Sequence, residues 1–283
     1  MRSISAELSL IPFVLFVAAC GGAVAAPGCA SASATAANIS EITDRLELRL
    51  EDGRLIRLAG VEILPPGPDA ASRAGAAAAE LRDYLGGRAI LVQPLTAKPD
   101  RWGRLAAQVF GPVETGAPPP YVNEALVAVG LLRVQPGAEA NACLAALFSA
   151  EAQARGAAFG LWAKPEFAAV DAADSEALNA RDGQFTLVEG RVRRVGQGRA
   201  RVYVDFGEGR GGFSLTVTKR IAARFTKAGH PLEGLAGRNL RARGIIGTRY
   251  GPQIEISGPE EIEFIEGSVD SALTKPMDKE GGR

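Results

Sequence analysis

The sequence has few residues of the kinds that carry histidine or zinc chemistry. It contains one histidine, His230, and three cysteines among 283 residues. A single histidine excludes a histidine-based triad and any metal cluster with several histidine ligands, and the cysteine spacing matches no metal motif. The formal net charge is zero and the pI is near 6.7. No field of the whole protein therefore attracts nucleic acid, and any attraction has to be local.

The N-terminal apolar run is too short to span a bilayer. Leu8 to Ala19 has the length of a signal-peptide core, and small residues follow it. Val17-Ala18-Ala19-Cys20 has the form of a lipobox, which predicts a signal segment over residues 1–30 and acylation of Cys20. Cleavage after Ala23-Val24-Ala25 and an uncleaved anchor are the alternatives. We expect an exported protein, either periplasmic or held at a bacterial envelope only through that lipid.

Two cysteines remain after either form of cleavage, Cys29 and Cys143. An even pair in an exported protein favours a disulfide. Two unpaired thiols, one of them a small buried residue on an Ala-rich helix, are the alternative.

Hydrophobic patterning predicts two strand-rich units. In the first, Glu41 to Val61 alternates apolar and polar residues around the turn Glu51-Asp52-Gly53, which predicts a β-hairpin. We expect helices over residues 69–85, 121–129 and 138–159, and strands over 89–95 and 105–110. This order is typical of a small β-barrel packed with helices, an α+β arrangement.

The second half predicts another small barrel, over residues 184–266. Its five strand-like runs are LVEGRVRRV, ARVYVDFG, FSLTVT, LRARGIIG and QIEIS, with a helix expected over 219–227. This is the layout of an oligonucleotide/oligosaccharide-binding (OB) barrel. We expect a polar linker over residues 166–183 and a disordered tail over 267–283.

Four motifs of the first unit carry a resemblance to a known family. RLAGVE, DRWGR, YVNEALVAVGLLRV and AEAQARGAAFGLW, in this order and spacing, resemble the thermonuclease (staphylococcal-nuclease-like) family over residues 38–165. A weaker resemblance links GIIGTRYGPQIEISGPEEIEFI to the closing hairpin of OB-like extensions. The first resemblance implies an OB barrel that hydrolyses DNA and RNA with Ca²⁺. In that family two aspartates hold the metal, a glutamate activates water and two arginines neutralise the phosphate.

When the motifs of that family are aligned with this sequence, only some of its metal ligands are present and its general base is absent. Its first aspartate is retained as Asp44, but the metal-binding second one falls on Leu46 and the general-base glutamate falls on Pro65. Glu62 replaces the remaining ligand with a longer carboxylate. Asp44 and Glu62 therefore predict a vestigial metal site at most, with Ca²⁺ as the cofactor only if activity remains.

The two arginines of the family are retained as Arg57 and Arg104. An ordinary exposed strand residue and an ordinary turn residue are the alternative interpretations. Loss of a general base alone costs about 10²–10⁴ in rate, so the resemblance predicts an impaired nuclease. A weak or metal-altered phosphodiesterase that uses Arg57, Arg104, Asp44 and Glu62 is the alternative.

Charge in the second unit is unevenly distributed along the chain. About fifteen Arg and Lys stand against about five Asp and Glu between residues 181 and 250, and about six acids follow over 255–270. Arginines at alternate strand positions with an aromatic residue among them are typical of a surface that contacts nucleic-acid phosphates and stacks a base. The residues with this pattern are Arg191, Arg193, Arg199, Arg201 and Tyr203. A solvated sheet face is the alternative. We expect a monomer that binds single-stranded nucleic acid or an envelope partner; a purely structural envelope lipoprotein is the remaining alternative.

Overall fold

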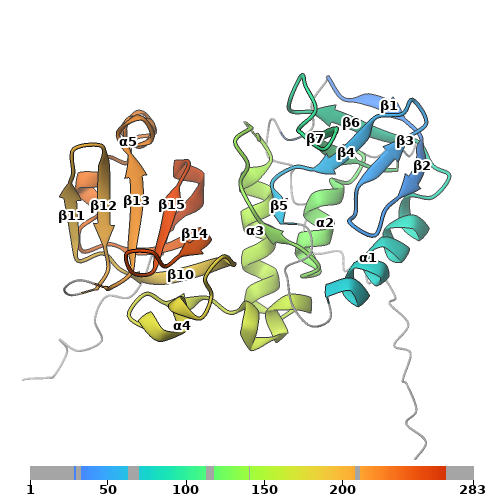
Figure 1. Ribbon diagram of the computed structural model, residues 1–283. Helices are drawn as coiled ribbons and strands as arrows, with labels where there is room; N and C mark the ends of the chain where they lie inside the picture. The colour runs from blue at the N-terminus through green and yellow to red at the C-terminus, as the bar shows by residue number, and fades with distance from the viewer. Residues whose placement is uncertain are drawn as a thin grey trace, which may run out of the picture.

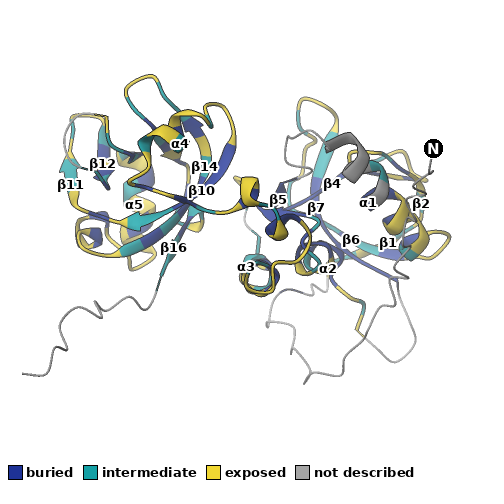
Figure 2. Ribbon diagram, turned by 90° about the horizontal axis from the view of Figure 1, so that it is seen from below, coloured by how far each residue is buried: buried dark blue, intermediate teal, exposed yellow. Residues whose placement is uncertain are grey.

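The protein has an α+β fold with a curled, six-stranded half-barrel sheet and a second, mixed sheet (Figure 1). The computed structural model describes residues 29, 33–62, 70–112, 118–139, 141–207 and 211–265, and five α-helices lie within these ranges. Buried residues concentrate in the strands, whereas the connecting turns are exposed (Figure 2). Residues 1–28 of the expected signal segment, with Cys20, the proline at position 65 and the C-terminal tail lie outside the described residues.

The half-barrel has the strand order β1-β6-β7-β4-β3-β2. Its strands are β1 (Thr35–Ala37), β2 (Ile39–Ile42), β3 (Leu48–Leu50), β4 (Leu55–Leu58), β6 (Ile90–Pro94) and β7 (Arg104–Phe110). Apolar residues alternate with polar ones, so Leu48, Leu50, Ile56 and Leu58 face the core. All pairs are antiparallel except β4 with β7.

The hairpin expected over residues 41–61 is wrong in one respect, because a second turn interrupts its first strand. The Thr43 carbonyl accepts a hydrogen bond from the N–H of Leu46 at 2.9 Å. The Thr43 hydroxyl accepts from the N–H groups of Arg45 and Glu47. Leu46 has a φ of 57°, and its side chain is fully buried. Asp44 and Leu46 therefore lie in a turn and not side by side on one strand face.

Three helices pack against the half-barrel: α1 (Ala70–Leu85), α2 (Val122–Ala128) and α3 (Leu144–Gly156). On α1 the buried residues Ala78, Leu81 and Leu85 recur at helical spacing. α3 begins six residues later than expected, because residues 135–139 and 141–143 are not helical. A two-stranded sheet joins β5 (Val61–Glu62) to β8 (Arg133–Val134).

The second sheet has the order β11-β12-β13-β15-β14-β10-β9, with β16 paired to β14. Its strands are β9 (Val170–Asp171), β10 (Phe185–Arg191), β11 (Arg194–Gln197), β12 (Arg201–Asp205), β13 (Ser214–Thr218), β14 (Asn239–Gly247), β15 (Gln253–Ile256) and β16 (Ile262–Phe264). The helix α5 (Lys219–Lys227) follows β13, as expected. The Thr218 hydroxyl caps its N-terminus by accepting a hydrogen bond from the N–H of Ile221. The β13–β15 and β9–β10 pairs are parallel.

The segment 166–183 is a folded part of the second unit, not the linker that composition predicts. It contains β9, which pairs with β10, and the helix α4 (Ser175–Asn179). Val170, Ala172 and Leu178 are buried in the core of the second unit. Alanine and polar residues dominate this segment, so its three apolar anchors are too few to register as a pattern.

A network of buried charges joins the two units along α3, which lies between the sheets (Figure 1). Arg243 on β14 is fully buried and binds Glu151 on α3 at 2.8 Å. The same guanidinium donates to the Val134 carbonyl at 2.7 Å and pairs with Glu263. Burial opposes the charge of Arg243, but its two carboxylate partners outweigh burial and raise its pKa.

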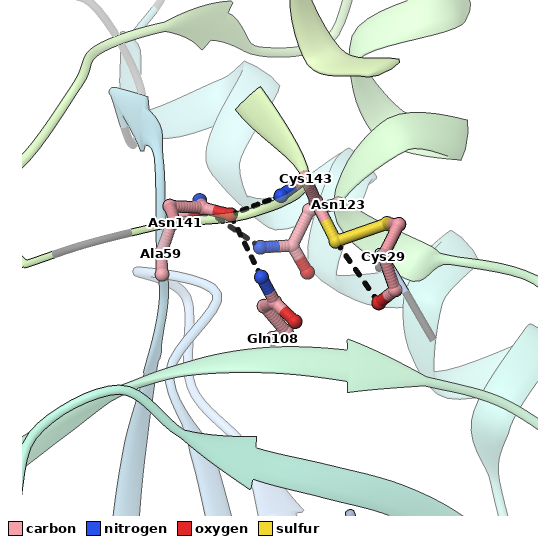
Figure 3. The surroundings of a disulfide bond; sticks show 6 residues. All are labelled: Cys29, Ala59, Gln108, Asn123, Asn141 and Cys143. Atoms are coloured by element: carbon pink, nitrogen blue, oxygen red, sulfur yellow. Dashed lines mark hydrogen bonds between the residues drawn. A yellow bond between two sulfur atoms is a disulfide. The ribbon is translucent and has the colours of Figure 1, made fainter. Parts of the chain in front are cut away.

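A disulfide joins Cys29 to Cys143, at the start of α3 (Figure 3). The two Cα atoms are 4.7 Å apart, and 114 residues separate the cysteines in sequence. Both side chains are buried.

None of the helices within the described residues is long and apolar enough to cross a membrane.

Candidate nucleic-acid interface

The half-barrel places Arg57 and Arg104 on the same face. The parallel register of β4 and β7 pairs Leu55 with Arg104 and Arg57 with Ala106. Paired residues of adjacent strands point to the same side of a sheet, so the two arginines are diagonal neighbours. The positions expected to bind phosphate are therefore brought together.

Both arginines already have carboxylate partners. Arg57 donates to Glu139 at 2.9 Å, and Arg104 contacts Glu47 at 3.0 Å and Asp100 at 2.9 Å. Burial works against the charge of Arg104, but the bonds to Asp100 and Glu47 outweigh it and raise the pKa of the guanidinium. Three carboxylates thus neutralise two arginines, which leaves little positive charge for a phosphate.

The two expected metal ligands, Asp44 and Glu62, pair with different arginines. The side chain of Asp44 is 80% exposed, and its Oδ1 lies 3.3 Å from Arg82 Nη2. Glu62 is buried and accepts a hydrogen bond from Arg133 at 2.7 Å. Burial raises the pKa of the Glu62 carboxyl, and the charge of Arg133 opposes only part of that shift. Neither carboxylate shares a partner with the other.

Leu46 occupies the position at which the thermonuclease resemblance implies a second metal-binding aspartate. Leu46 belongs to the hydrophobic core of the first unit. Within the parts of the chain that the structure describes, no group of three or more His, Cys, Asp or Glu side chains is placed to hold a metal ion. The expected general-base position, 65, lies outside the described residues.

Side chains along β12 alternate between the core and the solvent-exposed face of the second sheet. Val202 and Val204 point into the core, whereas Arg201 and Tyr203 point outward. Tyr203 lies opposite Thr216 on β13, which in turn lies opposite a residue of the parallel strand β15. Outward residues of these three strands therefore meet on one surface.

These outward residues line a groove of about 630 Å³. Its aromatic and apolar walls are Tyr203, 40% exposed, Tyr250, 77% exposed, and Ile245, 59% exposed. Arg201 and Arg249 also line it, and the Arg249 guanidinium lies 5.2 Å from the centre of the Tyr250 ring. Exposed aromatic rings beside arginines are the groups that stack bases and contact phosphates in single-strand-binding proteins.

The five residues predicted to contact nucleic acid do not form one surface. Only Arg201 and Tyr203 line the groove. Arg191 and Arg193 line a different hollow of about 510 Å³ with Phe206. The remaining arginine of the set, at position 199, lies in the turn between β11 and β12.

The basic and acidic stretches of the second unit come together in space. Glu255 pairs with Arg201 at 3.0 Å, Glu260 with Arg224 at 3.1 Å and Glu263 with Arg241 at 3.3 Å. The closing strands β15 and β16 and the turn between them carry these acids. Folding thus pairs three of the basic residues with acids of the closing segment.

Comparisons with known proteins give no family for this chain. No family model matches it, and no curated protein matches it. Inference of function therefore rests on the side chains described above.

Of the residues that line the groove, the sequence predicted only Arg201 and Tyr203. Among those that it missed, Ile245 lies on β14, and Arg249 and Tyr250 lie in the turn between β14 and β15. The signal available was Thr-Arg-Tyr-Gly, an arginine and an aromatic residue in a glycine-bounded turn between two strand-like runs. Such a turn presents its side chains to solvent next to the sheet face.

Proposed function

We propose that the protein binds single-stranded nucleic acid in the groove on the open face of the second sheet. We also propose that both units are OB-type barrels, and that the first is a thermonuclease-like barrel without efficient catalysis. The observation that carries the binding proposal is the convergence of two exposed tyrosines and one arginine, Tyr203, Tyr250 and Arg249, around one groove. Arg201 lines the same groove, but Glu255 pairs with it. Stacking tolerates any base because every base has a π-face.

We expect the double variant Tyr203→Ala/Tyr250→Ala to bind a fluorescein-labelled 12-nucleotide single strand at least about 30-fold more weakly than wild type, because stacking contributes about 1–3 kcal/mol per base. Fluorescence anisotropy measures this affinity. Phe159→Ala is the matched control, because Phe159 is an exposed aromatic residue, 56% exposed, of the first unit. Equal affinity of the double variant and wild type would exclude the groove as the binding surface.

Salt dependence separates nucleic acid from other ligands of the same groove. For single strands each phosphate contact contributes about −0.7 to the slope of log K against log salt. We expect Arg249→Ala to reduce that slope by about 0.7, whereas Arg199→Ala, in the turn outside the groove, leaves it unchanged. No binding by the wild-type protein at low salt would refute the proposal and favour the envelope-partner alternative.

A second candidate, a weak or metal-altered phosphodiesterase, has one observation in its favour: Arg57 and Arg104 share a face of the half-barrel. Against it, both are paired with carboxylates, and Asp44 and Glu62 belong to different ion pairs. The first unit is therefore proposed to retain the barrel and not the reaction.

We expect no cleavage of labelled single-stranded DNA above the EDTA control in Ca²⁺, Mg²⁺ or Mn²⁺. The measurement is a gel assay of the purified mature protein beside the Arg57→Ala/Arg104→Ala double variant. Metal-dependent cleavage that the double variant loses would establish the phosphodiesterase and overturn the non-catalytic proposal. Equal cleavage by both proteins would point to a contaminating nuclease.

The proposed location is the bacterial envelope, reached by export and held there by acylation of Cys20. The disulfide between Cys29 and Cys143 supports export, because disulfides persist in oxidising compartments.

A further inference from the structure

The groove on the second sheet contains a carboxylate. Among the described residues that line it, Glu255 alone is acidic. A carboxylate repels phosphates, so a surface that contacted only the nucleic-acid backbone would bind more weakly because of it. Its ion pair with Arg201 is exposed, by 37% for the arginine side chain and 58% for the glutamate, and exposed pairs add little to stability. Neither backbone contact nor stability therefore accounts for a glutamate at this position.

The strand register fixes where Glu255 lies relative to Tyr203. Tyr203 on β12 pairs with Thr216 on β13, and Thr216 pairs with Glu255 on β15. The three residues share one face of the sheet, and two strand spacings, about 10 Å, separate Tyr203 from Glu255. Thr216 is short and only 4% exposed, so it forms the floor between the two longer side chains. A base stacked on the Tyr203 ring can thus lie over Thr216 with one edge toward Glu255.

Arg201 holds a set of donors beside this carboxylate. Its Nη1 lies 3.0 Å from Glu255 Oε1 and 3.4 Å from the hydroxyl oxygen of Thr216. A carboxylate has about four lone-pair sites and a guanidinium has five N–H donors, so one shared contact uses only part of either group. The pair therefore presents hydrogen-bond acceptors next to donors in the groove.

We propose that Glu255 and Arg201 select guanine among the bases that enter the groove, an inference that rests on the proposed function. The Watson–Crick edge of guanine carries two adjacent donors, N1–H and the N2 amine, followed by the acceptor O6. Both donors donate to the Glu255 carboxylate, and O6 accepts from the Arg201 guanidinium. Every other base has a single donor group on this edge with an acceptor beside it, and the carboxylate repels that acceptor.

The experiment compares bases that differ only in this edge. Fluorescence anisotropy at one low salt concentration measures the affinity of the purified mature protein for labelled 12-nucleotide thymine strands in which every third base is guanine, adenine or hypoxanthine. Guanine and adenine are both purines, so their ratio separates recognition of the edge from stacking. We expect the guanine strand to bind about 10-fold more tightly than the adenine strand, within the range of a good bidentate contact to a base. Hypoxanthine lacks the N2 amine, and its strand is expected to bind with intermediate affinity.

Glu255→Gln is expected to bring the guanine-to-adenine ratio close to 1, because its amide has one acceptor oxygen in place of two. The same variant is expected to bind the adenine strand at least as tightly as wild type, since a negative charge has left the groove. A general loss of folding would weaken binding of both strands and is thereby distinguished. Glu260→Gln is the matched control, because it removes a carboxylate of similar exposure, 41%, from an ion pair outside the groove and is expected to leave the ratio at about 10.

The outcomes separate this inference from the proposed function. Equal affinity of the wild-type protein for the guanine and adenine strands would overturn the selection of guanine and leave binding in the groove intact. A guanine preference that survives Glu255→Gln would exclude Glu255 as the selecting residue. Binding of none of the strands would refute both proposals.

Discussion

Replacing Glu151 with alanine is expected to lower the free energy of unfolding by about 3–5 kcal/mol. Glu151 is fully buried, and it accepts hydrogen bonds from Arg243 and from the N–H of Val134. Without it, the buried guanidinium of Arg243 loses its carboxylate partner on α3, and the backbone N–H of Val134 loses its acceptor. The measurement is urea unfolding of the mature protein, followed by far-UV circular dichroism.

An exposed ion pair provides the control for this substitution. Arg194 and Asp205 are 2.7 Å apart, but the Arg194 side chain is 77% exposed. Arg194→Ala is expected to change the unfolding free energy by less than about 1 kcal/mol, since exposed pairs are weak. A Glu151→Ala effect as small as that of Arg194→Ala would mean that the buried network does not hold the two units together.

Removing the disulfide is expected to lower the free energy of unfolding by about 4 kcal/mol. The bond closes a loop with a sequence separation of 114 residues, and the loss of chain entropy in the unfolded state grows with loop length. The comparison is Cys29→Ala/Cys143→Ala against wild type in urea, each with and without dithiothreitol.

Dithiothreitol is expected to destabilise the wild-type protein to the level of the double variant and to leave the double variant unchanged. Wild-type stability that does not respond to the reductant, once mass spectrometry has shown both thiols to be free, would contradict this prediction.

The sequence predicts much of the fold where patterning is local. Alternation along β12, with Val202 and Val204 inward and Tyr203 outward, identifies a half-buried strand and its faces. The turn at residues 43–47 was missed because Leu46, an apolar residue with a positive φ, is atypical of turns. This turn is recognised only in the structure, where the Thr43 carbonyl accepts a hydrogen bond from the N–H of Leu46.

The candidate site was predictable only in part, for a different reason. Positional matching identifies Arg57 and Arg104, but their neutralisation depends on contacts across long stretches of chain. Glu139 lies 82 residues from Arg57, and Glu47 lies 57 residues from Arg104. Pattern and composition carry no information on such pairs. The same limit hid the pairing of the acidic closing strands with the basic strands, for example Glu263 with Arg241.

Glu62 takes part in the contact between the two units. Its carboxylate holds Arg133, and Arg133 in turn donates to the carbonyl of Phe185 in the second unit. Shortening Glu62 to aspartate, the residue that the thermonuclease resemblance implies for metal binding, would withdraw the oxygen from a buried cation at the junction of the two units. That substitution would therefore weaken the contact between the two units. The length of the side chain at position 62 is thus set by a contact that lies outside the first unit.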